Sequence, residues 1–157
     1  NEKYAYLFNE NELAAIRAHV PWTRKFKEEQ TEYNGESIDL VEYTRQNQQK
    51  LVLKPNDEYG GTGIFIGWNS SESEWSDAIN TSLEDGDYIV QERVKTAKES
   101  FPMLVGDKFV FSEQLVDLDP MLFDGKVKSA FTRLSTTELA NVSSGGGMVP
   151  TFIISEK

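Results

Sequence analysis

The sequence contains no cysteine and only one histidine, His19. The missing thiols exclude disulfides and thiolate metal sites, and they fit a reducing, cytoplasmic compartment. A multi-histidine metal site is excluded, as is most histidine-based catalysis. No apolar run approaches the roughly 18 residues that a membrane span needs. No apolar signal segment follows the polar N-terminus. We therefore expect a cytoplasmic protein that has no membrane partner.

Basic residues are also scarce. Lysine and arginine number 16 against 26 aspartates and glutamates, which gives a net charge of −10. This balance argues against nucleic acid as a partner, because phosphate backbones need clustered cations. Most of the acidic residues are expected to serve solubility. The length of 157 residues suits one domain with a sizeable core.

The order of hydrophobic patterns and turn signals predicts an α+β fold with mixed or antiparallel sheets and a few short helices. Asn34-Gly35 and Asp124-Gly125 are turn signals between strands. Helices are predicted over 10–20, 39–50 and 71–83. Strands are predicted over 51–55, 63–68, 88–94, 107–120, 126–135 and the end of 141–154. No repeat, linker or internal boundary divides residues 1–157, so a single domain is expected.

The stretch 51–67, LVLKPNDEYGGTGIFIG, places a lysine and three glycines between two predicted strands. It is not a Walker A loop, because Lys54 precedes the glycines and no helix follows them. It fits neither the dinucleotide fingerprint nor the kinase order. Glycine amides can fold over phosphates without obstruction by side chains, and Lys54 would add a positive charge. A plain surface hairpin with a glycine-rich turn is the open alternative.

The order of this loop, the helix after it and the strand YIVQERV resembles the ATP-grasp superfamily. More narrowly, the chain is similar to the circularly permuted ATP-grasp family related to glutathionylspermidine synthase. The resemblance covers most of the chain. Its motifs are VPWTR at 20–24, LVLKPNDEYGGTGIFIGW at 51–68, YIVQERV at 88–94, RLS at 133–135 and NVSSGGGMVP at 141–150.

The resemblance implies an ATP site and a role for each matching residue. Two lysines would contact the phosphates, a glycine lid would cover them, a hinge would line the adenine pocket, and an acid would reach the ribose. The two lysines are Lys54 and Lys3, and the lid is formed by Gly60, Gly61 and Gly63. The hinge consists of Gln91, Glu92, Arg93 and Val94, and the acid is Glu99. Arg133 would be catalytic, stabilising charge on the transferred phosphoryl group.

The family also needs Mg²⁺, but its ligands, an acidic pair with an asparagine, lie upstream of the region matched here. We therefore expect this chain to be the C-terminal part of a longer protein, inactive alone, with no metal ligand of its own. Asp117 and Asp119 are the best remaining carboxylate pair, and their i, i+2 spacing would place both on one strand face. A strand-end turn is the alternative there. Asn141 is expected to serve the loop rather than the site.

The remaining residues that could carry chemistry are expected to have structural roles. His19 is expected at a helix end, and the tryptophans Trp22, Trp68 and Trp75 in packing rather than in a sugar platform. Ser143 and Ser144 lack a base that would make a nucleophile. Their glycine-rich loop either approaches a substrate or is a simple connection.

The function that follows from the resemblance is that of an ATP-dependent carboxylate–amine ligase. The intact protein would phosphorylate a carboxylate, and an amine would then attack the acyl phosphate. Its partners would be ATP, the carboxylate, the amine and the upstream part of the same protein. The alternatives are a non-catalytic module that keeps the fold as a scaffold, and a β-rich carbohydrate or peptide binder.

Overall fold

The computed structural model describes residues 2–141, 146–152 and 154, with side chains from residue 4 onward. The chain forms two compact units, and each is described by itself. The first contains Asn1–Asp57 and Gly63–Val94, and the second contains Glu58–Thr62 and Lys95–Lys157. Both units are built from antiparallel sheets, and the helices are few, so the predicted α+β class is confirmed. The finer prediction of a single ATP-grasp-like domain stays a prediction.

The first unit opens with a 3₁₀ helix, η1 (Glu2–Leu7), and the helix α1 (Glu10–His19). Asn9 caps α1 in a reciprocal pair of hydrogen bonds. Its side-chain oxygen accepts from the Glu12 amide at 3.0 Å, and the Glu12 carboxylate accepts from the Asn9 amide at 2.8 Å. This capping box satisfies two donors at the helix start. The predicted helix is confirmed, and His19 is the last residue of the helix as expected.

A small hairpin follows the short strand β1 (Thr23–Lys25). Its strands β2 (Gln30–Tyr33) and β3 (Glu36–Asp39) are joined by Asn34 and Gly35, whose φ angles of 52° and 84° are both left-handed. Such a two-residue turn matches the twist of the strands it joins. The predicted turn is therefore confirmed. Asp39 then caps the helix α2 (Leu40–Gln46), and a 3₁₀ turn, η2 (Gln48–Lys50), leads into the main sheet.

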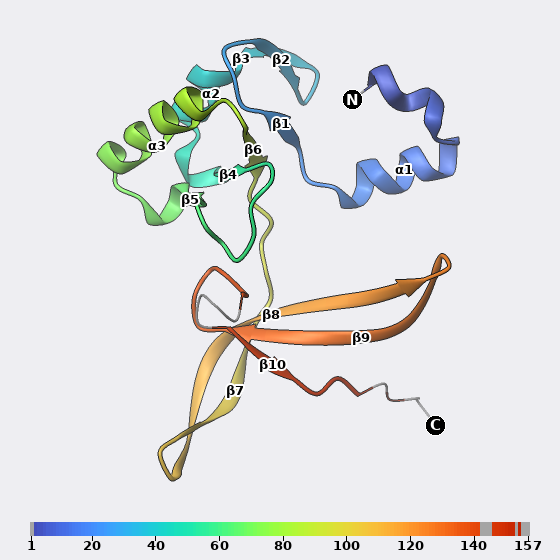
Figure 1. Ribbon diagram of the computed structural model, residues 1–157, viewed down its shortest axis with the longest axis vertical. Helices are drawn as coiled ribbons and strands as arrows, with labels where there is room; N and C mark the ends of the chain where they lie inside the picture. The colour runs from blue at the N-terminus through green and yellow to red at the C-terminus, as the bar shows by residue number, and fades with distance from the viewer. Residues whose placement is uncertain (1, 142–145, 153, 155–157) are drawn as a thin grey trace. The chain divides into compact units, whose positions relative to one another are not determined.

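The main sheet of the first unit has the strand order β1-β6-β4-β5, and all its neighbouring strands are antiparallel (Figure 1). It contains β4 (Leu51–Pro55), β5 (Phe65–Ile66) and β6 (Tyr88–Glu92). Val52 lies opposite Ile66 and Leu53 opposite Phe65, which confirms the predicted pairing across the glycine loop. The second strand is shorter than predicted, because the chain turns at Gly67 into the 3₁₀ turn η3 (Gly67–Asn69).

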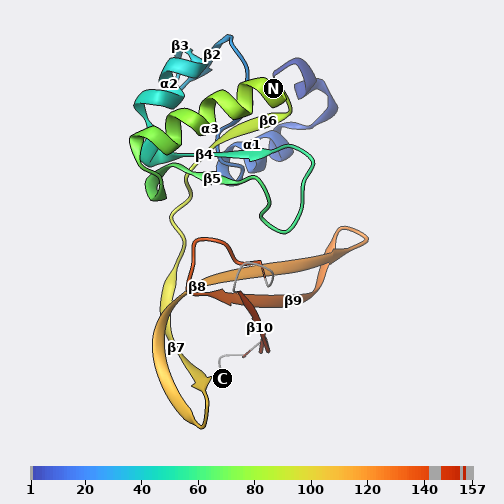
Figure 2. The same ribbon diagram turned by 60° about the vertical axis from the view of Figure 1, so that its left-hand side comes forward.

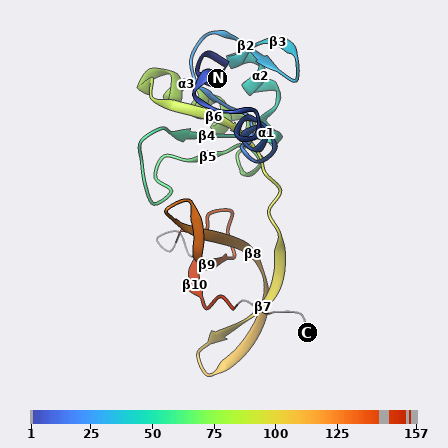
Figure 3. The ribbon, with the colours of Figure 1, turned by 90° about the vertical axis from the view of Figure 1, so that its right-hand side faces the viewer.

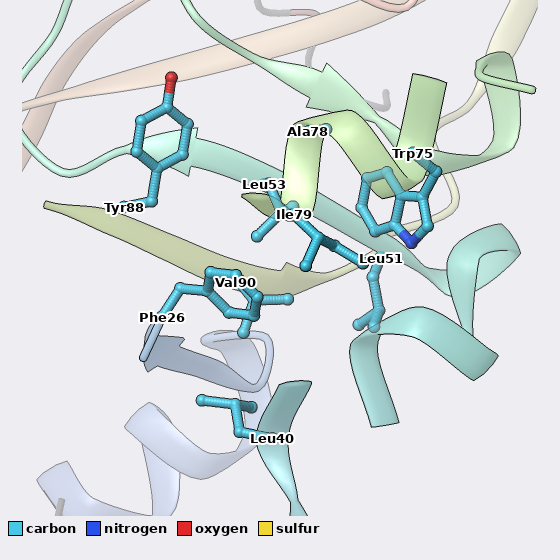
Figure 4. Close-up of a cluster of buried hydrophobic side chains, with 9 residues drawn as sticks. All are labelled: Phe26, Leu40, Leu51, Leu53, Trp75, Ala78, Ile79, Tyr88 and Val90. Carbon is cyan, nitrogen blue, oxygen red and sulfur yellow. The ribbon is translucent and has the colours of Figure 1, made fainter. Parts of the chain in front are cut away.

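The hydrophobic core lies between this sheet and the helix α3 (Glu72–Asp85), which begins at the N-cap Ser71. Leu51 and Leu53 of β4 lie on the side of the sheet where the buried α3 residue Ile79 packs (Figure 4). Trp75 is buried, and its ring nitrogen donates to the Thr44 carbonyl at 3.0 Å, which ties α3 to α2. Each buried side chain of this size contributes about 1.5–3 kcal/mol. The whole cluster is Phe26, Leu40, Leu51, Leu53, Trp75, Ala78, Ile79, Tyr88 and Val90.

The second unit is a sheet of strand order β10-β9-β8-β7. The long strand β8 (Lys108–Phe123) pairs first with β7 (Lys98–Val105) and then with β9 (Lys126–Ser135), and it bends between the two halves (Figures 2 and 3). β10 (Gly147–Val149) pairs with β9. The turn at Asp124-Gly125 is confirmed. The strand β7 was not predicted, because it lies at the edge of its sheet and contains Pro102.

None of the helices in the described residues is long and apolar enough to cross a membrane.

Gly67 makes the tightest backbone contact around the core. A Cβ added there would overlap the carbonyl oxygen of Gln48 and lie 2.7 Å from that of Leu51. We expect Gly67→Ala to lower the free energy of unfolding by about 3 kcal/mol, because backbone must move to relieve the overlap. Gly35→Ala is the control, since open space surrounds Gly35 and only its φ of 84° is strained. It should cost about 1–2 kcal/mol.

Urea unfolding followed by tryptophan fluorescence measures both losses. A loss in Gly67→Ala no larger than that in Gly35→Ala would contradict this account of the contact.

Candidate functional site

Lys54 lies near the end of β4, on the sheet face opposite the core. Because side chains alternate along a strand, burial of Leu51 and Leu53 places Val52 and Lys54 on the other face. There the Lys54 ammonium donates to the Gln91 side-chain oxygen at 2.8 Å. Both side chains are partly buried. The structure therefore brings together two of the residues that the sequence assigned to ATP.

Gln91 is itself held by a residue to which the sequence analysis gave no role. Its side-chain nitrogen donates to the Thr23 hydroxyl at 2.8 Å, and that hydroxyl donates to the Pro21 carbonyl at 2.9 Å. Thr23 lies directly opposite Gln91 in the pairing of β1 with β6. The motif VPWTR contains Thr23, but a threonine hydroxyl gives no sequence signal of its own.

The hydrogen-bond partner of Lys54 is uncharged. Among the described residues, no carboxylate forms an ion pair with Lys54, although the chain carries a net charge of −10. Lys25, on the same sheet face, pairs with Asp87 at 3.3 Å. Gln91 is neutral and leaves the Lys54 charge intact. This lysine is thus able to receive an anion.

The glycine loop begins and ends beside the end of β4. The Asn56 amide donates to the Asp87 carbonyl at 2.8 Å, which fixes the start of the loop. At its end, a Cβ on Gly63 would lie 2.8 Å from Pro55 Cγ and 2.9 Å from Tyr88 Oη. No residue in 57–63 is helical, as predicted. Gly60, Gly61 and Gly63 have φ angles of 68°, 82° and 71°, a region that favours glycine.

The residues of the predicted adenine hinge, Gln91 to Val94, do not share one set of contacts. Glu92 accepts from the Tyr33 hydroxyl at 2.9 Å, and the Arg93 guanidinium lies 4.1 Å from the centre of the Trp68 ring. Their amides donate to carbonyls of the first unit, that of Glu92 to Trp22 and that of Arg93 to Lys50. Val94 is exposed. Only Gln91 of these four contacts Lys54, and two hinge amides are already engaged.

Trp22, Tyr33 and Tyr43 form an aromatic cluster that contacts the Glu92 carboxylate through the Tyr33 hydroxyl. The Trp22 and Tyr33 rings meet edge to face at 5.2 Å, and the Tyr33 and Tyr43 ring centres lie 4.9 Å apart. Burial raises the pKa of Tyr43, and its hydrogen bond to Tyr33 and the charge of Glu92 raise it further. Trp75 is part of the hydrophobic core and Trp22 packs against it, as expected, whereas the Trp68 ring lies against the Arg93 guanidinium.

Arg133 lies on β9 of the second unit, directly opposite Asp117 of β8. Its guanidinium donates to Asp117 at 2.5 Å and lies 3.2 Å from the Asp119 carboxylate. The two aspartates share one face, as their spacing predicted, and they lie within the strand rather than in a turn. Two carboxylates around one guanidinium leave a net negative charge. The arrangement therefore holds Arg133 in place, and it opposes an incoming phosphate.

The other residues named from the sequence lie in other elements of the chain. Glu99 is exposed on β7, opposite Gln114. The Asn141 carbonyl accepts from the Gly146 amide at 3.0 Å, a loop contact. Lys3 lies in η1, and its side chain is outside the described residues, as are Ser143 and Ser144. Within the described residues, no group of three or more histidine, aspartate or glutamate side chains is placed to hold a metal ion.

No protein-family model matches the chain, and no curated protein matches it.

The raised pKa of Tyr43 gives an expectation for alkaline pH. In the unfolded chain this phenol ionises near pH 10, whereas in the folded protein it keeps its proton. The free energy of unfolding therefore falls as the pH rises above 10, because the Tyr43 phenol then loses its proton in the unfolded state but not in the folded state. Below pH 10 this loss is absent. Tyr43→Phe cannot ionise, so its stability should fall less steeply above pH 10. Urea unfolding at a series of pH values compares the slopes, and equal slopes would contradict the shift.

Proposed function

We propose that this chain is the ATP-binding part of an ATP-dependent carboxylate–amine ligase, of the circularly permuted ATP-grasp type related to glutathionylspermidine synthase. Lys54 binds the ATP phosphates from the open face of the first unit's sheet. The glycines of the 56–63 loop form the lid over the phosphates. Gln91 to Val94 line the adenine pocket partly through backbone groups, with Val94 as an apolar wall, since the Gln91 side chain faces Lys54. In the intact ligase, the activated carboxylate is captured by an amine to form an amide.

The observation that carries this proposal is the neutral partner of Lys54. A partly buried ammonium 2.8 Å from a carboxamide oxygen keeps its full charge, whereas a carboxylate partner would cancel most of it. In a protein of net charge −10, long-range repulsion of anions is offset only by such local cations. The left-handed φ angles of the three glycines that follow Lys54 support the same reading, since a loop of this kind carries no side chain at those positions.

Mg²⁺ does not fit the described residues. Asp117 and Asp119, which share one face of β8, are already occupied by Arg133. In the proposed ligase the Mg²⁺ ligands come from the upstream part of the protein.

A second candidate is a non-catalytic module that keeps the nucleotide-binding fold as a scaffold. The ion pairs of Arg133 favour it, because a guanidinium held by two carboxylates must leave them to stabilise a phosphoryl group. The arginine Nε–H resonance of Arg133 separates the candidates during an ATP titration. Movement of this resonance supports the ligase, and its constancy while ATP binds supports the scaffold.

The proposal predicts weak ATP binding that depends on Lys54. We expect a dissociation constant on the order of 0.1–1 mM, equivalent to about 4–5.5 kcal/mol. Lys54→Met should weaken ATP about tenfold, or about 1.4 kcal/mol, and should leave adenosine unaffected. Lys25→Met is the matched control. It removes the same charge from the same sheet face, but its lysine is paired with Asp87.

The measurement is a titration of isotope-labelled protein followed by amide shifts. Shifts in 54–63 and 89–95 support the proposal. Equal losses in the two lysine variants, or no response at several millimolar ATP from folded protein, would reject it.

A further inference from the structure

A chain of three hydrogen bonds crosses the open face of the first unit's sheet and ends at Lys54. The Pro21 carbonyl accepts from Thr23 at 2.9 Å, Thr23 accepts from Gln91 at 2.8 Å, and Gln91 accepts from Lys54 at 2.8 Å. The bonds join the segment before β1 to β6 and β4, and all the side chains are partly buried.

The two ends of this relay fix its direction. A carbonyl oxygen can only accept a hydrogen bond, and an ammonium can only donate. The Thr23 hydroxyl must therefore give its proton to Pro21, which leaves its oxygen to accept from Gln91. The Gln91 carboxamide must then turn its nitrogen to Thr23 and its oxygen to Lys54. The flipped carboxamide would set its N–H groups against the ammonium.

We infer that Thr23 is a positioning residue for phosphate binding, acting on Lys54 through Gln91. This inference rests on the proposed function. Thr23 fixes the Gln91 oxygen toward Lys54, and that oxygen holds the ammonium at the end of β4 without cancelling its charge. The arrangement separates two tasks, since a neutral group supplies the orientation and the lysine alone supplies the charge. A carboxylate in place of Gln91 would supply orientation but remove the charge.

The register supports a specific role for the hydroxyl. Thr23 and Gln91 are directly opposed on neighbouring strands, so their side chains meet without bending the sheet. Valine has the same shape and strand preference as threonine and lacks only the hydroxyl. Thr23→Val therefore tests the hydrogen bond, and Thr23→Ser restores the hydroxyl without the methyl group.

The matched control is Thr31→Val. The Thr31 hydroxyl accepts from Arg24 Nε at 2.9 Å, so this change also removes a partly buried hydrogen bond from a strand of the same unit, but outside the relay. ATP, inorganic tripolyphosphate and adenosine are the probes. The tripolyphosphate isolates the phosphate half of the site, and adenosine isolates the base half.

Thr23→Val should weaken ATP and tripolyphosphate about fivefold, the loss expected for one neutral hydrogen bond, while adenosine binding changes by less than about twofold. Thr23→Ser should bind within about twofold of the wild type, and Thr31→Val should not differ from it. Wild-type affinity for tripolyphosphate in Thr23→Val would overturn the inference. So would a loss that Thr23→Ser does not rescue, or one that Thr31→Val shares.

A ligand-free measurement distinguishes failure of this inference from failure of the proposed function. In the wild type, nuclear Overhauser effects should connect the Gln91 side-chain amide protons to Thr23 and not to the Lys54 side chain. In Thr23→Val, the contacts to residue 23 should weaken, because the carboxamide nitrogen loses its acceptor and the Gln91 side chain becomes more mobile. An unchanged pattern would overturn the relay. If wild-type protein shows the expected pattern but binds neither ATP nor tripolyphosphate, the proposed function fails and with it the role of Thr23 in phosphate binding.

Discussion

The alternation of side chains along β4 is the constraint on which the rest of the first unit depends. Leu51 and Leu53 must face α3 to form the core, and this requirement places Lys54 on the opposite face. A slip of one residue would bury the lysine and expose both leucines. The same strand thus provides the core and aims a cation at the open face, so stability and the candidate site cannot vary independently.

Lys54 and Arg133 differ in how their charge is balanced. Lys54 has a neutral carboxamide partner, whereas Arg133 has two carboxylates. The Lys54 charge, which has a neutral partner, remains available to a ligand. The Arg133 charge is neutralised by two aspartates, and these ion pairs connect β9 to β8. This difference separates a site ready to receive an anion from an ion-pair cluster that must open first.

Much of the fold was predictable because its signals are local. The caps at Asn9, Asp39 and Ser71 act within three residues, and the turns at Asn34-Gly35 and Asp124-Gly125 depend on two. β7 escaped prediction, because an edge strand that contains proline lacks the alternation of a buried one. The early end of β5 also escaped, since it depends on the contact of Gly67 with a carbonyl distant in sequence.

The sequence by itself determined the order of elements, the cation before the glycine loop and the absence of thiol chemistry. Only the tertiary structure decided which group faces that cation. Lys54 meets Gln91 across 37 residues, and Gln91 meets Thr23 across 68. Nothing within a short window encodes such contacts, because they arise when β1 and β4 pair with opposite edges of β6. The sequence likewise made Arg133 a catalytic candidate, and only the register of β8 with β9 placed it between two aspartates.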